Sequence, residues 1–366
     1  VTGVQTCALP ISSDVEFLLK PIRIELIGDL ELKESLIQSG ARHYSEMLSP
    51  EKVPSARYLE LFHDAHQRNR AQLSGDCLRL AQLLHAKHGS ELTLVSLARA
   101  GTPIGAVLRH LVARISGTPP AHYSISIIRD RGIDAAALSE ILSRGHRPES
   151  IAFVDGWTGK GVISRELTKA IAQYNQSHGT AIDPGLNVLT DLAGSAALAA
   201  SSEDYLISSS ILNSTISGLV SRSILNEAIL PGDYHGCVFF EEFAAHDLSQ
   251  WFVDDVVSGG IEYMENGGAP KTRGLSQSAR AAISRSYMKE AMWRYCITDE
   301  NLIKPGIGEA TRVLLRRSPQ RVIVRDRHEL KVAHLMALAE EKAVPVETEA
   351  SLPYNAVSII RSARDA

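Results

Sequence analysis

The residues with the clearest chemical potential lie in one short run. Ile151–Val154 is apolar, Asp155 follows it, and Thr158–Gly161 (Thr-Gly-Lys-Gly) precedes a segment with apolar residues at helical spacing. This pattern predicts a strand, a tight loop and a helix, because glycine lets the backbone turn and approach a ligand closely. The free N–H groups of a helix start favour an anion, and a carboxylate at a strand end accepts hydrogen bonds from hydroxyl groups. The run therefore predicts a sugar-phosphate site.

The same run resembles the phosphoribosyl-diphosphate (PRPP) loop of the type I phosphoribosyltransferases. In that family a hydrophobic strand ends in two acids, and a short Thr/Gly-rich loop follows. Asp155 stands in the place of the first acid, whereas Gly156 stands in the place of the second. The resemblance implies that Asp155 binds ribose hydroxyls and that the loop, Thr158, Gly159, Lys160 and Gly161, holds the 5′-phosphate. The alternative is a tight βα turn of a flavodoxin-like domain that binds no ligand.

A second unit of the same kind precedes it. Leu92–Leu97 predicts a strand, the following residues to Pro103 predict a loop, and a helix comes next because apolar residues recur at helical spacing. Arg99 and Gly101 suit an anion. Ser96–Gly101, which includes Ala100, resembles the loop that binds pyrophosphate in the phosphoribosyltransferases.

Two further strands complete the predicted sheet. Tyr123–Ile128 leads into Arg129 and Asp130, which are either a diphosphate contact or a solvated charged turn, and Asn187–Leu192 carries Asp191. Strands that alternate with helices favour a mostly parallel sheet, and such sheets bind ligands at the carboxyl ends of their strands. We expect Arg99, Arg129, Asp155 and Asp191 to meet there. Ser217-Gly218 with Arg222 is another candidate anion contact.

The overall composition is that of a globular protein with room for two domains. The chain has 366 residues, of which 44% are hydrophobic and 22% charged, and its net charge is −4. No apolar run approaches the length of a membrane span, so we expect a cytoplasmic protein without a membrane partner. Residues 1–12 resemble translated adapter sequence rather than a signal peptide. We expect domains at 13–274 and 296–366, joined by a helix over 275–295, and a homo-oligomer remains open.

Two patterns elsewhere offer less. His85 and His88 end a predicted helix that begins at Arg57, and without a third ligand we expect no metal held by protein side chains alone. The four cysteines have no zinc-site spacing. Cys237 follows His235 by two residues, a spacing that rarely gives an activated thiol.

The C-terminal segment has a different charge balance. Between Asn301 and Met336, three acids face eight basic residues: Lys304, Arg312, Arg316, Arg317, Arg321, Arg325, Arg327 and Lys331. The excess of five positive charges is typical of a phosphate-binding surface, although a solvated face is the alternative. The pattern predicts a helix (308–317), a strand (321–324), a helix (329–342) and a strand (344–347). We expect a small α/β/α sandwich.

The start of that first helix resembles a known RNA-binding motif. Gly308, Glu309 and Arg312 follow the Gly-x-Asn-Glu-x-x-Lys signature of pelota-type domains, with Gly308 in place of the Asn. The resemblance implies that this helix start contacts RNA. Lys304, Arg316 and Arg317 are further candidates for contacts with RNA phosphates.

The two resemblances together are those of a bacterial family encoded beside tellurite-resistance and stress genes, the StiP family, which also bears a cysteine-protease label. They imply a type I phosphoribosyltransferase fold with a helical cap, followed by a pelota-like domain. The expected reaction is transfer of ribose 5-phosphate from PRPP, with Mg²⁺, to a nitrogenous acceptor, by way of Asp155, Arg99, Arg129 and Asp130. The alternatives are a non-catalytic protein that binds PRPP or a nucleotide and RNA, and a cysteine hydrolase.

Overall fold

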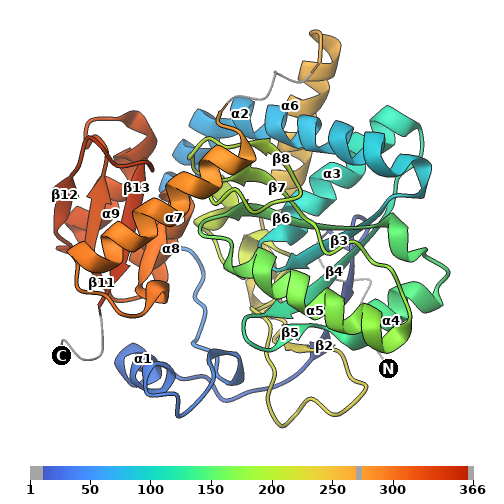
Figure 1. Ribbon diagram of the computed structural model, residues 1–366, viewed down its shortest axis with the longest axis horizontal. Coiled ribbons are helices and arrows are strands. Elements are labelled where there is room, and N and C mark those ends of the chain that lie inside the picture. The colour runs from blue at the N-terminus through green and yellow to red at the C-terminus, as the bar shows by residue number, and fades with distance from the viewer. Residues whose placement is uncertain (1–10, 269–273, 362–366) are drawn as a thin grey trace.

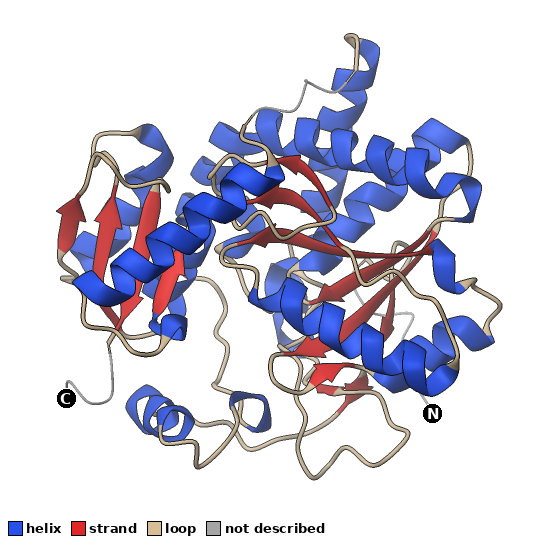
Figure 2. Cartoon of the chain, in the orientation of Figure 1, coloured by secondary structure: helices blue, strands red, loops and turns tan. Residues whose placement is uncertain are grey.

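The computed structural model describes residues 11–268 and 274–361, and its strands form a large and a small β-sheet with helices packed against them (Figures 1 and 2). The large sheet has the strand order β1-β4-β3-β6-β7-β8, and β5 pairs with β4. All neighbours on the main path are parallel, and only β5 runs antiparallel. The predicted α/β fold with a mostly parallel sheet is therefore confirmed. The strands are β1 Glu16–Leu18, β3 Thr93–Ala98, β4 Ala121–Ile128, β5 Gly132–Ile133, β6 Ile151–Thr158, β7 Leu186–Asp191 and β8 Leu198–Ser201.

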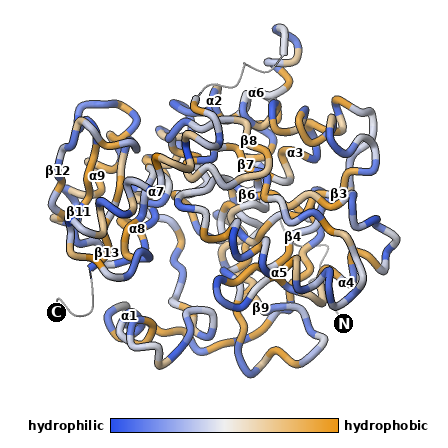
Figure 3. The backbone as a smooth tube through the Cα atoms, in the orientation of Figure 1, coloured by the Kyte–Doolittle hydropathy of each residue, from blue (hydrophilic) through white to orange (hydrophobic). Residues whose placement is uncertain are grey.

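Helices cover both faces of this sheet because its central strands are apolar on both sides. In β6, Ala152 and Val154 pack with helices α2, α3 and α6, whereas Ile151 and Phe153 pack with α4 and α5. Strand residues alternate between faces, so a continuous apolar run is what a doubly covered strand requires. Figure 3 shows hydrophobic residues along the central strands of the sheet. The helices are α2 Ala56–His88, α3 Gly101–Ser116, α4 Ala135–Ser143, α5 Val162–His178 and α6 Ser249–Glu265.

Strand β6 is longer than the sequence predicts. Its pairing with β7 continues through Asp155, Trp157 and Thr158, which lie opposite Val188, Thr190 and Asp191. Asp155 therefore lies inside the strand rather than at its end. Gly156 does not interrupt the strand, because a strand accepts glycine at some cost in stability.

The small sheet forms the C-terminal part of the molecule. Its order is β10-β13-β11-β12. On one face Val322 and Val324 pack with α8 and α9, and on the other Ile323 packs with α7. Helices thus lie on both faces of this sheet. Its elements are α7 Gln277–Arg294, β10 Ile303–Pro305, α8 Ile307–Arg316, β11 Pro319–Val324, α9 Ala333–Glu341, β12 Val346–Thr348 and β13 Ala356–Ile360.

An N-terminal arm, residues 19–55, runs along both parts (Figure 1). Its strand β2 (Lys20–Pro21) pairs with β9 (Gly236–Cys237), and its helix α1 (Leu30–Gln38) is capped by Asp29. Glu34 on α1 forms an ion pair with Arg317 of the C-terminal part. The arm therefore connects the two sheets.

The remaining described elements are short 3-10 helices: Tyr44–Glu46, Gly89–Glu91, Pro148–Ser150, Ser208–Ser210, Ser214–Ile216, Glu241–His246, Glu300–Leu302 and Leu330–Val332. Across residues 11–268 and 274–361, no helix has the length and apolar character needed to cross a membrane.

Candidate functional site

The glycine-rich loop Thr158–Gly161 contacts the C-terminal part of the chain. The Lys160 ammonium donates a hydrogen bond to the main-chain oxygen of Glu300, and a Cβ at Gly159 would lie 3.2 Å from the main-chain oxygen of Pro305. Gly161 has a φ of 75°, which suits glycine, and caps α5. The loop expected to hold a phosphate is thus packed against β10 and the turn before it.

Asp191 and Thr158 are also engaged within the protein. The Thr158 hydroxyl donates to Asp191, whose two carboxylate oxygens accept main-chain N–H groups of Ala193, Ser195 and Ala196 at 3.0–3.1 Å. Asp191 is only 5% exposed. It orders the loop between β7 and β8, and its two oxygens already accept four hydrogen bonds from the protein.

The second predicted anion loop, Ser96–Gly101, also contacts other parts of the protein. A Cβ at Gly101 would clash with the main-chain oxygen of Val154, so this glycine lets α3 approach β6 closely. Ala100 is the N-cap residue of α3 and provides no side-chain hydrogen bond. The Arg99 guanidinium pairs with Glu51 at 2.6 Å. Arg99 does lie beside Asp155's strand as expected, but its partner is a carboxylate of the arm.

Asp155 faces the C-terminal helix α8. One of its oxygens accepts the main-chain N–H of Gly156 at 2.8 Å. Burial raises the pKa of Asp155 to about 6, while Arg312 lowers it and Glu309 raises it. Its neighbour Trp157 donates from Nε1 to Glu309 at 3.3 Å, and the Arg312 guanidinium lies 5.7 Å from the Trp157 ring centroid. The two sites predicted separately therefore meet at one junction.

The start of α8 points into this junction. A Cβ at Gly308 would lie 3.3 Å from the Trp157 ring, so the start of α8 lies close against β6. The Gly306 N-cap has no side chain, and Asp204 of the first part accepts the N–H of Ile307 at 2.8 Å instead. The helix start expected to contact RNA thus contacts protein on two sides. Arg312, at 39% side-chain exposure, still reaches solvent.

Positive charge collects where α8, the arm and the large sheet meet. We define the junction cluster as seven basic residues with mutual electrostatic effects: Lys33, Arg99, Arg222, Lys304, Arg312, Arg316 and Arg317. Four acids lie among them, Glu34, Glu51, Asp155 and Glu309. The excess is three positive charges at a place where charges lose hydration.

Crowding is visible in the pKa values of the cluster. Burial, together with neighbouring arginines, lowers the pKa of Lys33 to about 8 and that of Arg222 to about 10. The pKa of Lys304 is lowered by burial, although nearby Glu309 raises it. These directions mean that the loss of hydration outweighs the effect of the nearby acids on the protonated forms.

The partners of the cluster are unevenly distributed. Glu34 and Glu309 pair with Arg317 and Arg312. Arg316 donates only to the main-chain oxygens of Ser210 and Leu212, at 3.1 and 2.7 Å. Within the described part of the chain, the Lys304 ammonium makes no hydrogen bond or ion pair. A cation that is crowded by protein and has no carboxylate partner favours binding of an external anion.

Arg129 and Asp130 lie at the edge of this region. The guanidinium groups of Arg129 and Arg222 lie 5.3 and 5.4 Å from the ring centroid of Tyr44, on the arm. Arg129 pairs with Asp130 at 3.1 Å, and Asp130 is mostly exposed. The pair behaves as the charged turn that was the alternative interpretation of these residues.

The cysteines do not form a nucleophile with an adjacent base. Cys77 and Cys237 are fully buried, and burial raises the pKa of Cys237 to about 12. The His235 ring bonds to the Ser126 hydroxyl at 2.7 Å rather than to a thiol. Cys296 is exposed. No cysteine between residues 11 and 361, the undescribed gap excepted, has a hydrogen bond to a histidine or a carboxylate.

Sequence reasoning missed Lys33, Glu51 and Trp157 as members of this region. Arg222 was a candidate anion contact because it follows Ser217-Gly218, whereas Lys33 and Glu51 lie in an arm without a recognisable motif. Only the folded arrangement brings them to α8.

Comparison with known proteins identifies relatives over nearly the whole chain. Residues 11–257 match the family model described as "Tellurite-like stress resistance cysteine protease StiP", and residues 282–362 match the "PELOTA RNA binding domain". The chain is 40% identical over 361 residues to "Cysteine protease StiP" of Acinetobacter baylyi, which covers 96% of this chain and 93% of the relative.

These matches correct the expected activity. The resemblance to the StiP family and the pelota-type match are confirmed, but the family and the relative are named for a cysteine protease, a hydrolase, and not for a phosphoribosyltransferase. The transfer reaction assigned to Asp155, Arg99, Arg129 and Asp130 is therefore wrong, and the roles of PRPP and Mg²⁺ were derived from it. The physical reason is that a strand, a glycine-rich turn and a helix form the same local structure whether the turn holds a ligand or, as here, another part of the chain.

Proposed function

We propose that this chain binds RNA at the junction between its two sheets. The chain belongs to the StiP family, and its C-terminal part matches the pelota RNA-binding domain. The observation that carries the proposal is the junction cluster, which joins cations from α8 to cations from the arm and the first part of the chain. Both parts of the molecule would then contribute to one RNA site.

The chemistry of the cluster favours contact with the RNA backbone. Arginine and lysine side chains bind phosphate oxygens without regard to sequence, whereas base recognition needs hydrogen-bonding groups at base edges. Gly308 offers no side chain for that purpose. The residues with donors to spare are Arg312, whose side chain is 39% exposed, and Lys304, whose ammonium has no partner among the described residues.

The name of the relatives raises thiol chemistry as the competing function. The thiolate is the reactive form of cysteine, and it needs a lowered pKa or an adjacent base. Cys237 has a raised pKa, and His235 beside it in the sequence bonds to Ser126. The side-chain geometry therefore supports RNA binding better than it supports a cysteine nucleophile.

Fluorescence anisotropy with a labelled RNA hairpin that carries an internal loop tests the proposal. We expect Arg312→Glu and Lys304→Glu each to weaken binding about tenfold or more, and to reduce the slope of log K against log salt by about 0.7–0.9 for each lost phosphate contact. Arg285→Glu is the matched control, because Arg285 is an exposed arginine of the same C-terminal part that lies outside the cluster.

Two results would contradict the proposal. One is equal weakening by Arg285→Glu and Arg312→Glu, which would indicate attraction to overall charge only. The other is unchanged affinity in the Lys304→Glu, Arg312→Glu double variant, provided that its far-ultraviolet circular dichroism matches that of the original protein.

A further inference from the structure

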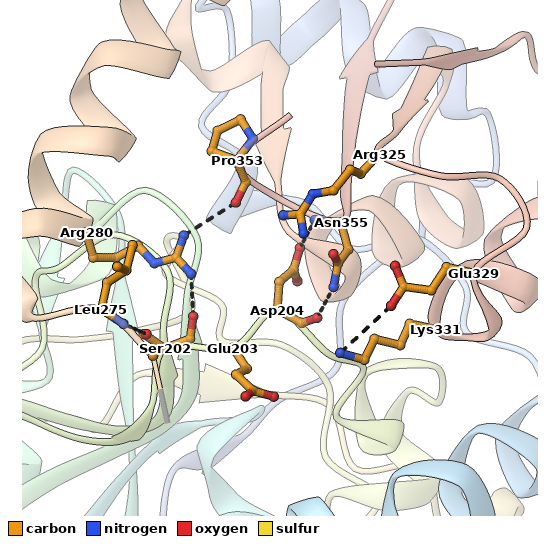
Figure 4. Close-up of a pocket in the computed structure, with 11 residues that line it drawn as sticks. Ser202, Glu203, Asp204, Leu275, Arg280, Arg325, Glu329, Lys331, Pro353 and Asn355 are labelled. Atoms are coloured by element: carbon orange, nitrogen blue, oxygen red, sulfur yellow. Dashed lines mark hydrogen bonds and ion pairs between the residues drawn. The ribbon is translucent and has the colours of Figure 1, made fainter. Parts of the chain in front are cut away.

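A polar cavity lies on the other side of the α8 start, between the two parts of the chain (Figure 4). Its volume is about 210 Å³, and a neighbouring cavity of about 200 Å³ shares Ser202, Leu275 and Arg280 with it. The residues that matter for its chemistry are Ser202, Asp204, Arg280, Arg325, Lys331 and Asn355. None of them belongs to the junction cluster.

Arg280 is an unusual residue for a cavity wall, because it is nine-tenths buried and forms no ion pair with a carboxylate of the described residues, although its charge opposes the rise that burial causes in the pKa of nearby Asp204. Its two terminal nitrogens donate to the main-chain oxygens of Ser202 and Pro353, at 2.5 and 3.4 Å. Its Nε has no hydrogen-bond partner among the residues that the structure describes, and Arg280 is only 9% exposed. A buried guanidinium that bonds only to neutral oxygens keeps its full positive charge.

Arg325 provides a second cation. Its Nε donates to the main-chain oxygen of Leu352 at 2.8 Å, and it forms no ion pair with any of the described residues. The guanidinium groups of Arg280 and Arg325 approach the cavity from different sides (Figure 4). Two arginines across a small space form a geometry that suits the oxygens of a phosphate or carboxylate.

The acids around the cavity are already engaged. Asp204 accepts the N–H groups of Ile307 and Asn355, at 2.8 and 2.7 Å. Glu203 accepts from the amide of Gln72 at 3.0 Å, and Glu329 lies 3.9 Å from the Lys331 ammonium. The free hydrogen-bonding capacity in this space is therefore mainly that of donors on Arg280, Arg325 and Lys331.

We propose that this cavity is a binding site for a small anion with phosphate or carboxylate oxygens. A cavity of about 210 Å³ has room for inorganic phosphate or a small dicarboxylate. The site does not depend on RNA binding at the junction cluster. It touches the same helix, because Asp204 lines the cavity and also holds the start of α8.

Isothermal titration calorimetry of the whole chain without RNA tests this site, with inorganic phosphate and malonate as separate probes and sodium chloride as the blank. We expect saturable binding of at least one probe with a Kd of about 1 mM or tighter. Arg325→Gln and Lys331→Gln should each weaken it about tenfold, and Arg285→Gln, on α7 outside the cavity, should leave it unchanged. Binding of phosphate alone would identify a phosphate-bearing ligand, and binding of malonate alone a carboxylate.

The inference is overturned if neither probe gives a saturable heat, or if Arg325→Gln binds as tightly as the original chain. Arg280→Gln is a stronger perturbation, since Arg280 also holds the chain near Ser202 and Pro353. If that variant does not fold, Arg325→Gln and Lys331→Gln still decide the question. RNA binding is measured separately, so failure of one proposal leaves the other intact.

Discussion

Replacing Asp204 with alanine tests how the two parts of the chain are joined. Asp204 lies after β8 of the first part and is 6% exposed. Its carboxylate accepts the N–H of Ile307, which opens α8, and the N–H of Asn355, which precedes β13. Alanine would remove the acceptor for two buried donors of the other part at once.

The expected loss follows from these contacts. A buried N–H left without a partner costs about 1–3 kcal/mol, and loss of a helix cap costs about 0.5–2 kcal/mol. Two such groups would cost about 2–6 kcal/mol in a sealed site. Because the neighbouring cavity lets water replace part of the carboxylate, we expect about 2–4 kcal/mol of lost unfolding free energy.

Urea unfolding followed by both tryptophan fluorescence and circular dichroism provides the measurement. Two probes are needed, because a chain with two sheets need not unfold in a single step. Asp204→Asn is the control: it keeps one acceptor oxygen, so its loss should be smaller than that of alanine. A loss below about 0.5 kcal/mol in the alanine variant would refute the assignment of Asp204 as the cap of α8, since surface substitutions have effects of that size.

Two further predictions concern the thiols and Asp155. Cys7, which lies outside the described residues, is first replaced by serine. Iodoacetamide should then modify Cys296 rapidly and leave the buried Cys77 and Cys237 intact until the protein unfolds, as measured by intact mass. Rapid modification of Cys237 in the folded protein would contradict its buried position. The pKa of Asp155 is raised from 3.8 to about 6 in the folded protein, so folding favours its neutral form. The stability that this contributes is complete below about pH 4 and is lost as the pH rises through 6. Asp155→Asn should therefore become more stable relative to the original chain over that range in urea titrations, and parallel pH profiles for the two proteins would count against the raised pKa.

Much of the fold was predictable from local pattern. Strands β3, β4 and β7 and helices α2 and α5 lie within a few residues of the predicted segments, because each carries its own apolar periodicity. The strand β13 was missed, since it becomes a central strand only by pairing with β10 and β11, which are distant in the sequence. Such long-range pairing leaves little local signal.

The sequence predicted the two separate parts of the site, but it did not predict that they contact each other. The glycine-rich run and the basic helix were both recognised, and both lie at the junction. No local pattern indicates that Pro305 and Glu300 cover the run, or that Trp157 packs on Gly308. Motif resemblance identified the family correctly, and it led to the wrong reaction because the contacts that occupy the loop come from about 140 residues further along the chain.

The packing of Gly308 on Trp157 affects how this protein can be studied in pieces. One hydrophobic cluster runs from the large sheet through Ile207 and Ile211 into α8 and α9. The two parts therefore share a hydrophobic core and are not joined by an exposed hinge. A recombinant fragment that contained only the C-terminal part would display to solvent an apolar face that the complete chain conceals. RNA affinity or solubility measured on such a fragment would describe that artificial face, and full-length variants are therefore the sound basis for functional work.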